Sequence, residues 1–85
     1  MRKIVLTNPA LEDLIFWSKN DAKTIGKIIN LIADIQRNPF EGIVKPEPLK
    51  HNLSGNWSRR IDNVNRLVNN VTDFEINILS CRYHY

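Results

Sequence analysis

The sequence predicts an α+β domain in which two N-terminal helices pack on one face of a twisted antiparallel sheet. In the first half of the chain, apolar side chains recur about every 3.6 residues, which is the spacing of a helix. From Leu53 onward, apolar and polar side chains alternate instead, as they do in strands. Turn signals divide this second half into three segments, which is typical of an antiparallel meander. Helices followed by strands, rather than alternating with them, favour the α+β class.

The helical half begins after a short expected strand at residues 3–6. Asn8 is the expected N-cap of the first helix, with Pro9 at the first helical position, where its missing N–H costs nothing. Asp21 is expected to cap the second helix, which carries a stripe of isoleucines and ends before Asn38-Pro39. The two helices should therefore form a hairpin.

The segment 39–52 holds three prolines and one glycine, so we expect it to be mostly irregular. Pro46 and Pro48 flank Glu47 and restrict the backbone on both sides of its carboxylate. The strands expected after this loop are 57–61, 66–71 and 75–82. The sheet face away from the helices should be open and should carry basic side chains.

The chain has 85 residues, so we expect one domain spanning 1–85. A domain of this size buries only about 60% of the surface that its unfolded chain exposes, which favours a stabilising partner or a homodimer. No apolar run approaches the ~20 residues that span a bilayer, so no membrane association is expected. The single cysteine, Cys81, cannot form an internal disulfide, and we expect it to be a small buried side chain in a cytoplasmic protein.

Positive charge is concentrated in one part of the chain. The net charge is +3, and the segment 45–66, with five Lys or Arg and two Asp or Glu residues, carries all of it. Such a patch attracts polyanions such as RNA. A merely solvated charged face is the equally weighted alternative.

RNA can be cut without a metal when the 2′-hydroxyl attacks the adjacent phosphorus. This reaction needs a base, an acid for the leaving 5′-oxygen, and positive charge on the phosphorane. The acid–base candidates are Glu47, His51 and His84, and the stacking candidates are Trp57, Tyr83 and Tyr85. Each has an ordinary alternative, such as an exposed loop carboxylate, a structural histidine or a core tryptophan. No residues have metal-site spacing, and neither a metal nor a cofactor is expected.

Three segments carry a resemblance to a known family: NPFEGIVKPEPLKHNLSGNWSRRI, NRLV and the terminal CRYHY. They resemble the YoeB/Txe toxins of the RelE superfamily, and the likeness extends over nearly the whole chain. The resemblance implies a RelE-like, microbial-RNase-like fold. It also implies a type II toxin that cuts mRNA on the ribosome, inhibits translation and is neutralised by a cognate YefM-type antitoxin.

The resemblance implies roles for particular residues. Glu47 matches the general base, Arg66 the arginine that stabilises the transition-state phosphate, His84 the general acid, and Tyr85 a tyrosine that orients the substrate. The residues expected to contact RNA or the ribosome are Lys50, His51, Arg59, Arg60 and Arg82. The alternative function is a non-catalytic binding module of the same fold, either a gyrase-inhibitor-like toxin or a repressor component.

Two positions depart from the family pattern HRLVY, because Asn65 and Asn69 stand where His and Tyr are common. Neither change falls on a residue with an implied catalytic role, so activity is expected to survive. The terminal pair raises a geometric problem, since adjacent residues in a strand point to opposite faces. His84 and Tyr85 can serve one site only if the last two or three residues leave the strand and curl over the sheet face.

Overall fold

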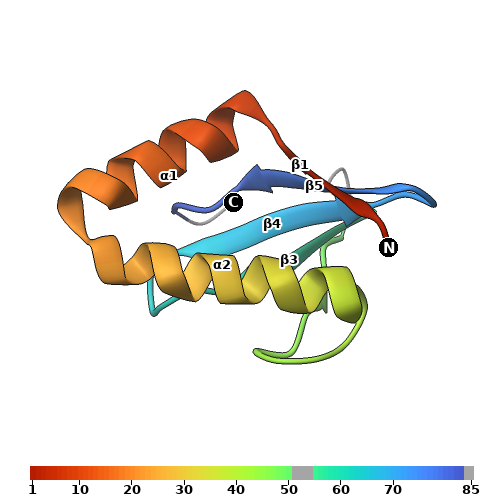
Figure 1. Ribbon diagram of the computed structural model, residues 1–85. Coiled ribbons are helices and arrows are strands. Elements are labelled where there is room, and N and C mark those ends of the chain that lie inside the picture. Colours follow the sequence, from red (N-terminus) through yellow and green to blue (C-terminus); the bar gives the residue numbers. More distant parts are fainter. Residues whose placement is uncertain (51–54, 84–85) are drawn as a thin grey trace.

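The structure is a computed structural model that describes residues 1–50 and 55–83 of the chain. Its elements are β1 (Lys3–Leu6), α1 (Asn8–Asn20), α2 (Ala22–Arg37), β2 (Glu47–Pro48), β3 (Asn56–Arg60), β4 (Arg66–Val71) and β5 (Glu75–Ser80). Figure 1 shows α1 and α2 joined by a tight turn, with α2 crossing in front of β4 and β3 and α1 lying above the strands in this view. The predicted α+β class is confirmed: within the described residues, two helices pack on one five-stranded sheet.

The sheet has the strand order β1-β5-β4-β3-β2. Its centre is the predicted meander, because β3 pairs antiparallel with β4, and β4 with β5. At one edge, β1 runs parallel to β5, with Ile4 opposite Ile76, so the sheet is mixed and the prediction of a wholly antiparallel sheet is wrong there. A tight turn joins only antiparallel neighbours. The two helices separate β1 from the meander and allow it to dock along a strand from the other end of the chain.

The opposite edge of the sheet lies in the segment that was predicted to be irregular. Glu47 and Pro48 form the two-residue strand β2, antiparallel to β3, with Glu47 opposite Ser58. The Leu49 amide extends this pairing by donating to the Asn56 carbonyl at 2.9 Å. Proline has no N–H to give to a ladder, but an edge strand tolerates it. The pairing fixes Glu47 against the sheet, which a free loop would not do.

The helix starts differ in detail from the predicted caps. Thr7, one residue before the predicted Asn8, is the N-cap of α1, and its hydroxyl oxygen accepts the Ala10 amide at 3.3 Å. Asp21 is the N-cap of α2, as predicted, but its carboxylate accepts the Thr24 hydroxyl at 2.9 Å rather than a backbone amide. Among the described residues, neither helix is long and apolar enough to cross a membrane.

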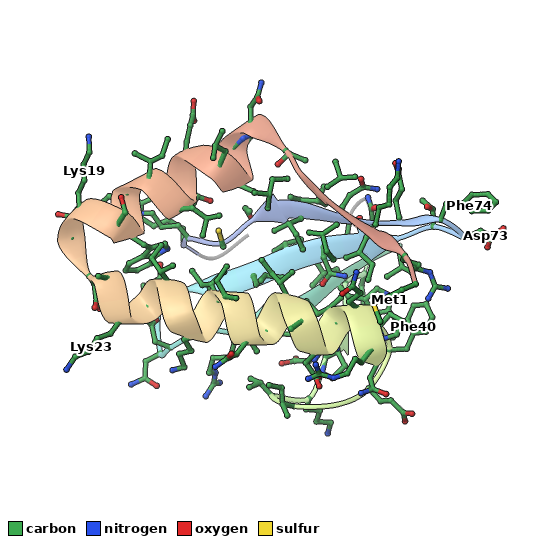
Figure 2. The ribbon with its side chains drawn as sticks, in the orientation of Figure 1. Met1, Lys19, Lys23, Phe40, Asp73 and Phe74 are labelled. Carbon is green, nitrogen blue, oxygen red and sulfur yellow. The ribbon has the colours of Figure 1, made fainter. Side chains whose placement is uncertain are left out.

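The hydrophobic core lies between the helices and one face of the sheet. Its most deeply buried members include Ile28, Leu31 and Ile35 from α2 and Leu67, Ile76 and Ile78 from β4 and β5. Burial of each such side chain contributes about 1.5–3 kcal/mol. Figure 2 shows Lys19 and Lys23 pointing away from this core at the turn between the helices. The core also includes Ala10 and Trp17 of α1, which confirms that both helices cover the same face of the sheet. The opposite face of the sheet is not covered by the helices.

Two glycines are expected to respond oppositely to substitution by alanine. Gly26 lies inside α2, and an added Cβ would meet nothing within 4 Å, so Gly26→Ala should stabilise the fold by about 0.5–1 kcal/mol. Gly42 has a φ of 109°, and an added Cβ would collide with Asp34 Oδ2, so Gly42→Ala should destabilise it by more than ~1 kcal/mol. Urea unfolding of both variants measures the difference. Stabilisation by Gly42→Ala would contradict the described loop.

Candidate active site

An ion pair between Glu47 and Arg66 lies on the sheet face away from the helices. Arg66 Nη2 donates to Glu47 Oε1 at 2.7 Å, and Arg66 Nε donates to Ser58 Oγ. The Arg66 side chain is 12% exposed and the Glu47 side chain 58%. The cation is thus largely enclosed, whereas the carboxylate remains open to an incoming ligand.

Strand register explains why these residues meet. Leu67 belongs to the core, and neighbouring strand residues point to opposite faces, so Arg66 points to the other face. Ser58 on β3 is opposite both Glu47 on β2 and Val68 on β4, which aligns the three strands. The site therefore combines side chains from three adjacent strands rather than from one loop.

The pKa of Glu47 is lowered from its ordinary value. The largest cause is the hydrogen bond from Arg66, followed by the charge of Arg66, with smaller contributions from the charges of Arg60 and Lys45. A shallow hollow of about 250 Å³ lies beside this carboxylate and is lined by Val44, Lys45, Glu47 and Arg60. Glu47 is therefore ionised at neutral pH, as a general base must be, and has cations next to it that could hold a phosphate.

Removal of Arg66 should raise the pKa of Glu47. Arg66→Gln removes the hydrogen-bonded cation that is the largest cause of the lowered pKa, so the pKa should return towards the ordinary value of 4.5. Arg60→Gln removes a more distant charge and should produce a smaller upward shift. An NMR titration of the Glu47 side-chain carboxyl carbon measures both shifts. Equal shifts in the two variants would contradict a dominant role for the Arg66 contact.

The chain after β5 leaves strand geometry and is fastened to α1. β5 ends at Ser80, and the next amide, of Cys81, donates to Asp13 Oδ2 at 2.9 Å. Trp17 Nε1 donates to the Cys81 carbonyl at 2.8 Å. The Cys81 side chain is fully buried, as predicted, and burial followed by the nearby Asp13 charge raises the pKa of its thiol to about 12. Both backbone polar groups of Cys81 are thus bound to α1 side chains.

Tyr83 brings this tail to the ion pair. Its φ of 65° lies in the left-handed region, which non-glycine residues rarely adopt. The Tyr83 amide donates to Asn65 Oδ1 at 2.7 Å, and the Tyr83 carbonyl accepts the Arg66 amide at 3.1 Å. The predicted last strand, 75–82, therefore ends two residues early, at Ser80, and Tyr83 lies beside Arg66. The predicted curl of the last two or three residues falls mainly on His84 and Tyr85, which lie outside the described residues.

Arg59 does not have the position that an RNA-contacting residue needs. It lies on the core face opposite Leu67, its side chain is fully buried, and Nη1 bonds to Asp34 Oδ2 at 2.6 Å. Its guanidinium also donates to the loop carbonyls of Asn38, Glu41 and Ile43 at 2.7–3.1 Å. Arg59 therefore supports the loop that leads to Glu47, and we correct the expected RNA contact accordingly.

A sequence signal for this support was present. Arg59 is two residues from both Trp57 and Ile61 and so shares their face of the strand; since Ile61 is a core residue, the pattern already placed Arg59 towards the core. Asp34 interrupts the apolar stripe of α2 and is only 7% exposed. A buried arginine and a buried carboxylate each need the other, because an isolated buried charge is costly.

The other expected basic residues differ in their surroundings. Lys50 and Arg60 are exposed and can meet an anion. Arg82 is half-buried, with its guanidinium carbon 3.3 Å from the ring centre of Phe16 and 4.3 Å from that of Tyr83. The expected sites His51, His84 and Tyr85 lie outside the described residues.

The contacts of Trp57 bear on its candidate role as a base-stacking residue. Trp57 is half-buried against Phe40, with ring centres 5.3 Å apart, and is therefore a packing residue rather than an open stacking platform. Two residues at this site were missed: Ser58, which accepts from Arg66, and Asn65, noted only as a departure from a family pattern. Within the ranges 1–50 and 55–83, no group of three or more His, Cys, Asp or Glu side chains could hold a metal ion.

Comparison with known proteins gives consistent matches over the full length. Residues 6–85 match the family described as YoeB-like toxins of bacterial type II toxin–antitoxin systems. Toxin YoeB of Escherichia coli strain K12 is 51% identical over 83 residues, which cover 98% of this chain and 99% of that protein.

Two solved structures from Staphylococcus aureus are also similar. A YoeB dimer superposes with a TM-score of 0.90 at 47% identity, covering 99% of this chain and 98% of that one. A YoeB–YefM complex superposes with a TM-score of 0.88 at 45% identity, covering 100% of this chain and 99% of that one. Sequence, fold and length agree, and the chain therefore belongs to the YoeB-like toxins of bacterial type II toxin–antitoxin systems.

Proposed function

We propose that this chain is an endoribonuclease that cuts mRNA on the ribosome and thereby inhibits translation. The observation that carries the proposal is the Glu47–Arg66 pair: an ionised, open carboxylate bound to an enclosed arginine. The family membership supports the same function. A non-catalytic binding module would have no need of an ionised carboxylate next to several cations, here Arg66, Arg60 and Lys45, that could bind a phosphate.

The proposed reaction needs no metal ion. The Glu47 carboxylate takes the proton of a ribose 2′-hydroxyl as the 2′-oxygen bonds to phosphorus. Arg66 stabilises the negative charge of the phosphorane, exchanging part of its contact with Glu47 for the phosphate oxygens. The bond to the 5′-oxygen breaks, and His84 gives that oxygen a proton. The products are a 2′,3′-cyclic phosphate and a 5′-hydroxyl.

The parts assigned to His84 and Tyr85 come from the family resemblance. Support from the described residues is indirect: the Tyr83 carbonyl, which is covalently joined to the His84 nitrogen, bonds to the amide of Arg66. His84 is thus the next residue along a chain that has already reached the arginine. We propose His84 as general acid and Tyr85 as the residue that orients the substrate.

Binding of the RNA and the ribosome is proposed to use the exposed cations. Lys50 and Arg60 are accessible and lie in sequence next to β2 and within β3. We propose His51 and Arg82 as further contacts; for Arg82 this requires its guanidinium to act from between two aromatic rings. Such contacts hold the backbone and carry no base specificity.

The proposed partners follow from the relatives. A YoeB–YefM complex from Staphylococcus aureus supports a YefM-type antitoxin for this chain, and a YoeB dimer from the same organism supports a homodimer. Because ribosomes and mRNA are the proposed targets, we propose that the protein acts in the cytoplasm.

The decisive experiment maps RNA ends in a reconstituted translation reaction. Purified protein is added to ribosomes programmed with a defined mRNA, and new 5′ ends are located by primer extension. We expect discrete cuts that carry a 5′-hydroxyl and a 2′,3′-cyclic phosphate, and no cuts in mRNA without ribosomes. Intact mRNA together with inhibited DNA supercoiling by gyrase would instead favour the binding-module alternative.

A further inference from the structure

Asn65 connects the turn between β3 and β4 to the C-terminal tail. Its side-chain oxygen, Oδ1, accepts the Tyr83 amide at 2.7 Å. Its side-chain nitrogen, Nδ2, donates to both carboxylate oxygens of Asp62 at 3.1 Å. Asp62 Oδ1 also accepts the backbone amides of Val64 and Asn65, at 2.8 and 2.7 Å. The carboxylate thus fixes which end of the Asn65 amide faces the tail.

This arrangement is independent of pH near neutrality. Desolvation raises the pKa of Asp62, but the hydrogen bonds from Asn65 and Val64 outweigh it and leave the pKa below its ordinary value. Asp62 therefore remains an acceptor, and the amide of Asn65 does not titrate at all. A histidine, common at this position in the family that the sequence resembles, would titrate in the physiological range.

Both polar backbone groups of Tyr83 are held by two adjacent residues. The Tyr83 amide donates to the side chain of Asn65, and the Tyr83 carbonyl accepts the backbone amide of Arg66 at 3.1 Å. These two bonds hold Tyr83 at a φ of 65°, a conformation that a tyrosine rarely adopts unaided. Tyr83 directly precedes His84, the proposed general acid, in the sequence.

We propose that Asn65 is a positioning residue for the reaction: it holds the Tyr83 backbone beside Arg66, and loss of this contact slows the step that needs the proposed acid, His84. The inference rests on the proposed function of the site. It reverses the sequence-based expectation that this departure from the family pattern touches nothing catalytic. Asn65 acts on the reaction only through Tyr83 and the residue that follows it.

The first test measures the hydrogen bond between Asn65 and Tyr83 directly and does not depend on RNA cleavage. Asn65→Leu keeps a similar size but removes both the acceptor for Tyr83 and the donor to Asp62. Asn63→Leu is the matched control, since Asn63 is an exposed asparagine of the same turn. Hydrogen exchange of the Tyr83 amide, followed by NMR, should become faster in Asn65→Leu and remain unchanged in Asn63→Leu. Unchanged protection in Asn65→Leu would overturn the proposal.

The second test separates an effect on the acid from an effect on folding or RNA binding. Programmed ribosomes carry mRNA with either an ordinary 5′-oxygen or a bridging 5′-sulfur at the cleaved bond. Sulfur leaves as a thiolate and needs no proton. On the oxygen substrate, Asn65→Leu should slow single-turnover cleavage at least about tenfold, since a ~1 Å misplacement of a catalytic group can cost ~100-fold. On the sulfur substrate most of this loss should disappear.

The ratio between the two substrates is insensitive to the fraction of folded protein, because both are cut by the same preparation. An equal loss on both substrates would overturn the proposal, since the bond would then serve the fold or RNA binding. A full rate on both would overturn it as well. Failure of the proposed function would look different from failure of this inference. The wild-type protein would then cut neither substrate, or His84→Gln would cut both at the normal rate. Either result would be independent of the exchange rate of the Tyr83 amide.

Discussion

Glu47→Gln is expected to lower the rate of mRNA cleavage by about 10²- to 10⁴-fold, the usual contribution of a general acid or base. The amide has the shape of the carboxylate, and its oxygen can still accept from Arg66 Nη2. It cannot take a proton from the 2′-hydroxyl. The loss should therefore appear in the single-turnover rate at saturating ribosome concentration rather than in the affinity for ribosomes.

A glutamate in the loop before β2 provides the control for this experiment. Glu41 is exposed, and its backbone carbonyl accepts from Arg59 Nη2. Glu41→Gln removes the same charge from the protein and should cut mRNA at the wild-type rate. Urea unfolding of both variants should resemble that of the wild type. A Glu47→Gln variant that cuts at the normal rate would eliminate Glu47 as the base.

Arg59→Met is expected to destabilise the fold by about 3–5 kcal/mol, as loss of one partner from a buried ion pair does. It leaves the Asp34 carboxylate, only 7% exposed, without its closest cation. It also leaves the carbonyls of Asn38, Glu41 and Ile43 without the donors that hold the loop before Glu47. Urea unfolding measures the loss.

Arg60→Met is the matched control, because Arg60 is the neighbouring arginine on the exposed face. Its unfolding free energy should remain within ~0.5 kcal/mol of the wild type. The double variant Asp34→Leu, Arg59→Met should be more stable than Arg59→Met alone, since no buried charge is then unpaired. Equal destabilisation by Arg59→Met and Arg60→Met would contradict the burial of Arg59.

The pH dependence of the Arg59→Met effect has a defined sign. Burial raises the pKa of Asp34, but bonds from Arg59 and the Ile43 amide outweigh it and leave the pKa below 3.8. The ionised carboxylate therefore contributes stability above pH 3.8 that is lost as the pH falls through the lowered value. Without Arg59 the burial effect dominates and the pKa rises. The cost of Arg59→Met should thus be largest near neutral pH and should shrink on acidification.

Local patterns were sufficient for the elements and for part of the site. The apolar stripe of α2 and the alternation after residue 53 specify two helices and a meander, because both depend on residues close together in sequence. The KPEP segment and NRLV identified Glu47 and Arg66 through resemblance, and register then brought the two side chains to 2.7 Å. The position of Arg59 could also have been predicted from its two-residue spacing from Ile61, which places both side chains on one face of the strand.

Long-range partners were decided only by the tertiary structure. Three contacts join residues that are distant in the chain. β1 pairs parallel with β5, and Asp34 accepts from both Arg59 and the amide of Ile43. Asn65 accepts the amide of Tyr83. A sequence pattern indicates which side of a strand is apolar, but the partner of a polar group depends on what the completed fold brings within hydrogen-bond distance. Residue types and local elements were therefore determined by the sequence alone, whereas the roles of Arg59 and Asn65 became visible only after packing.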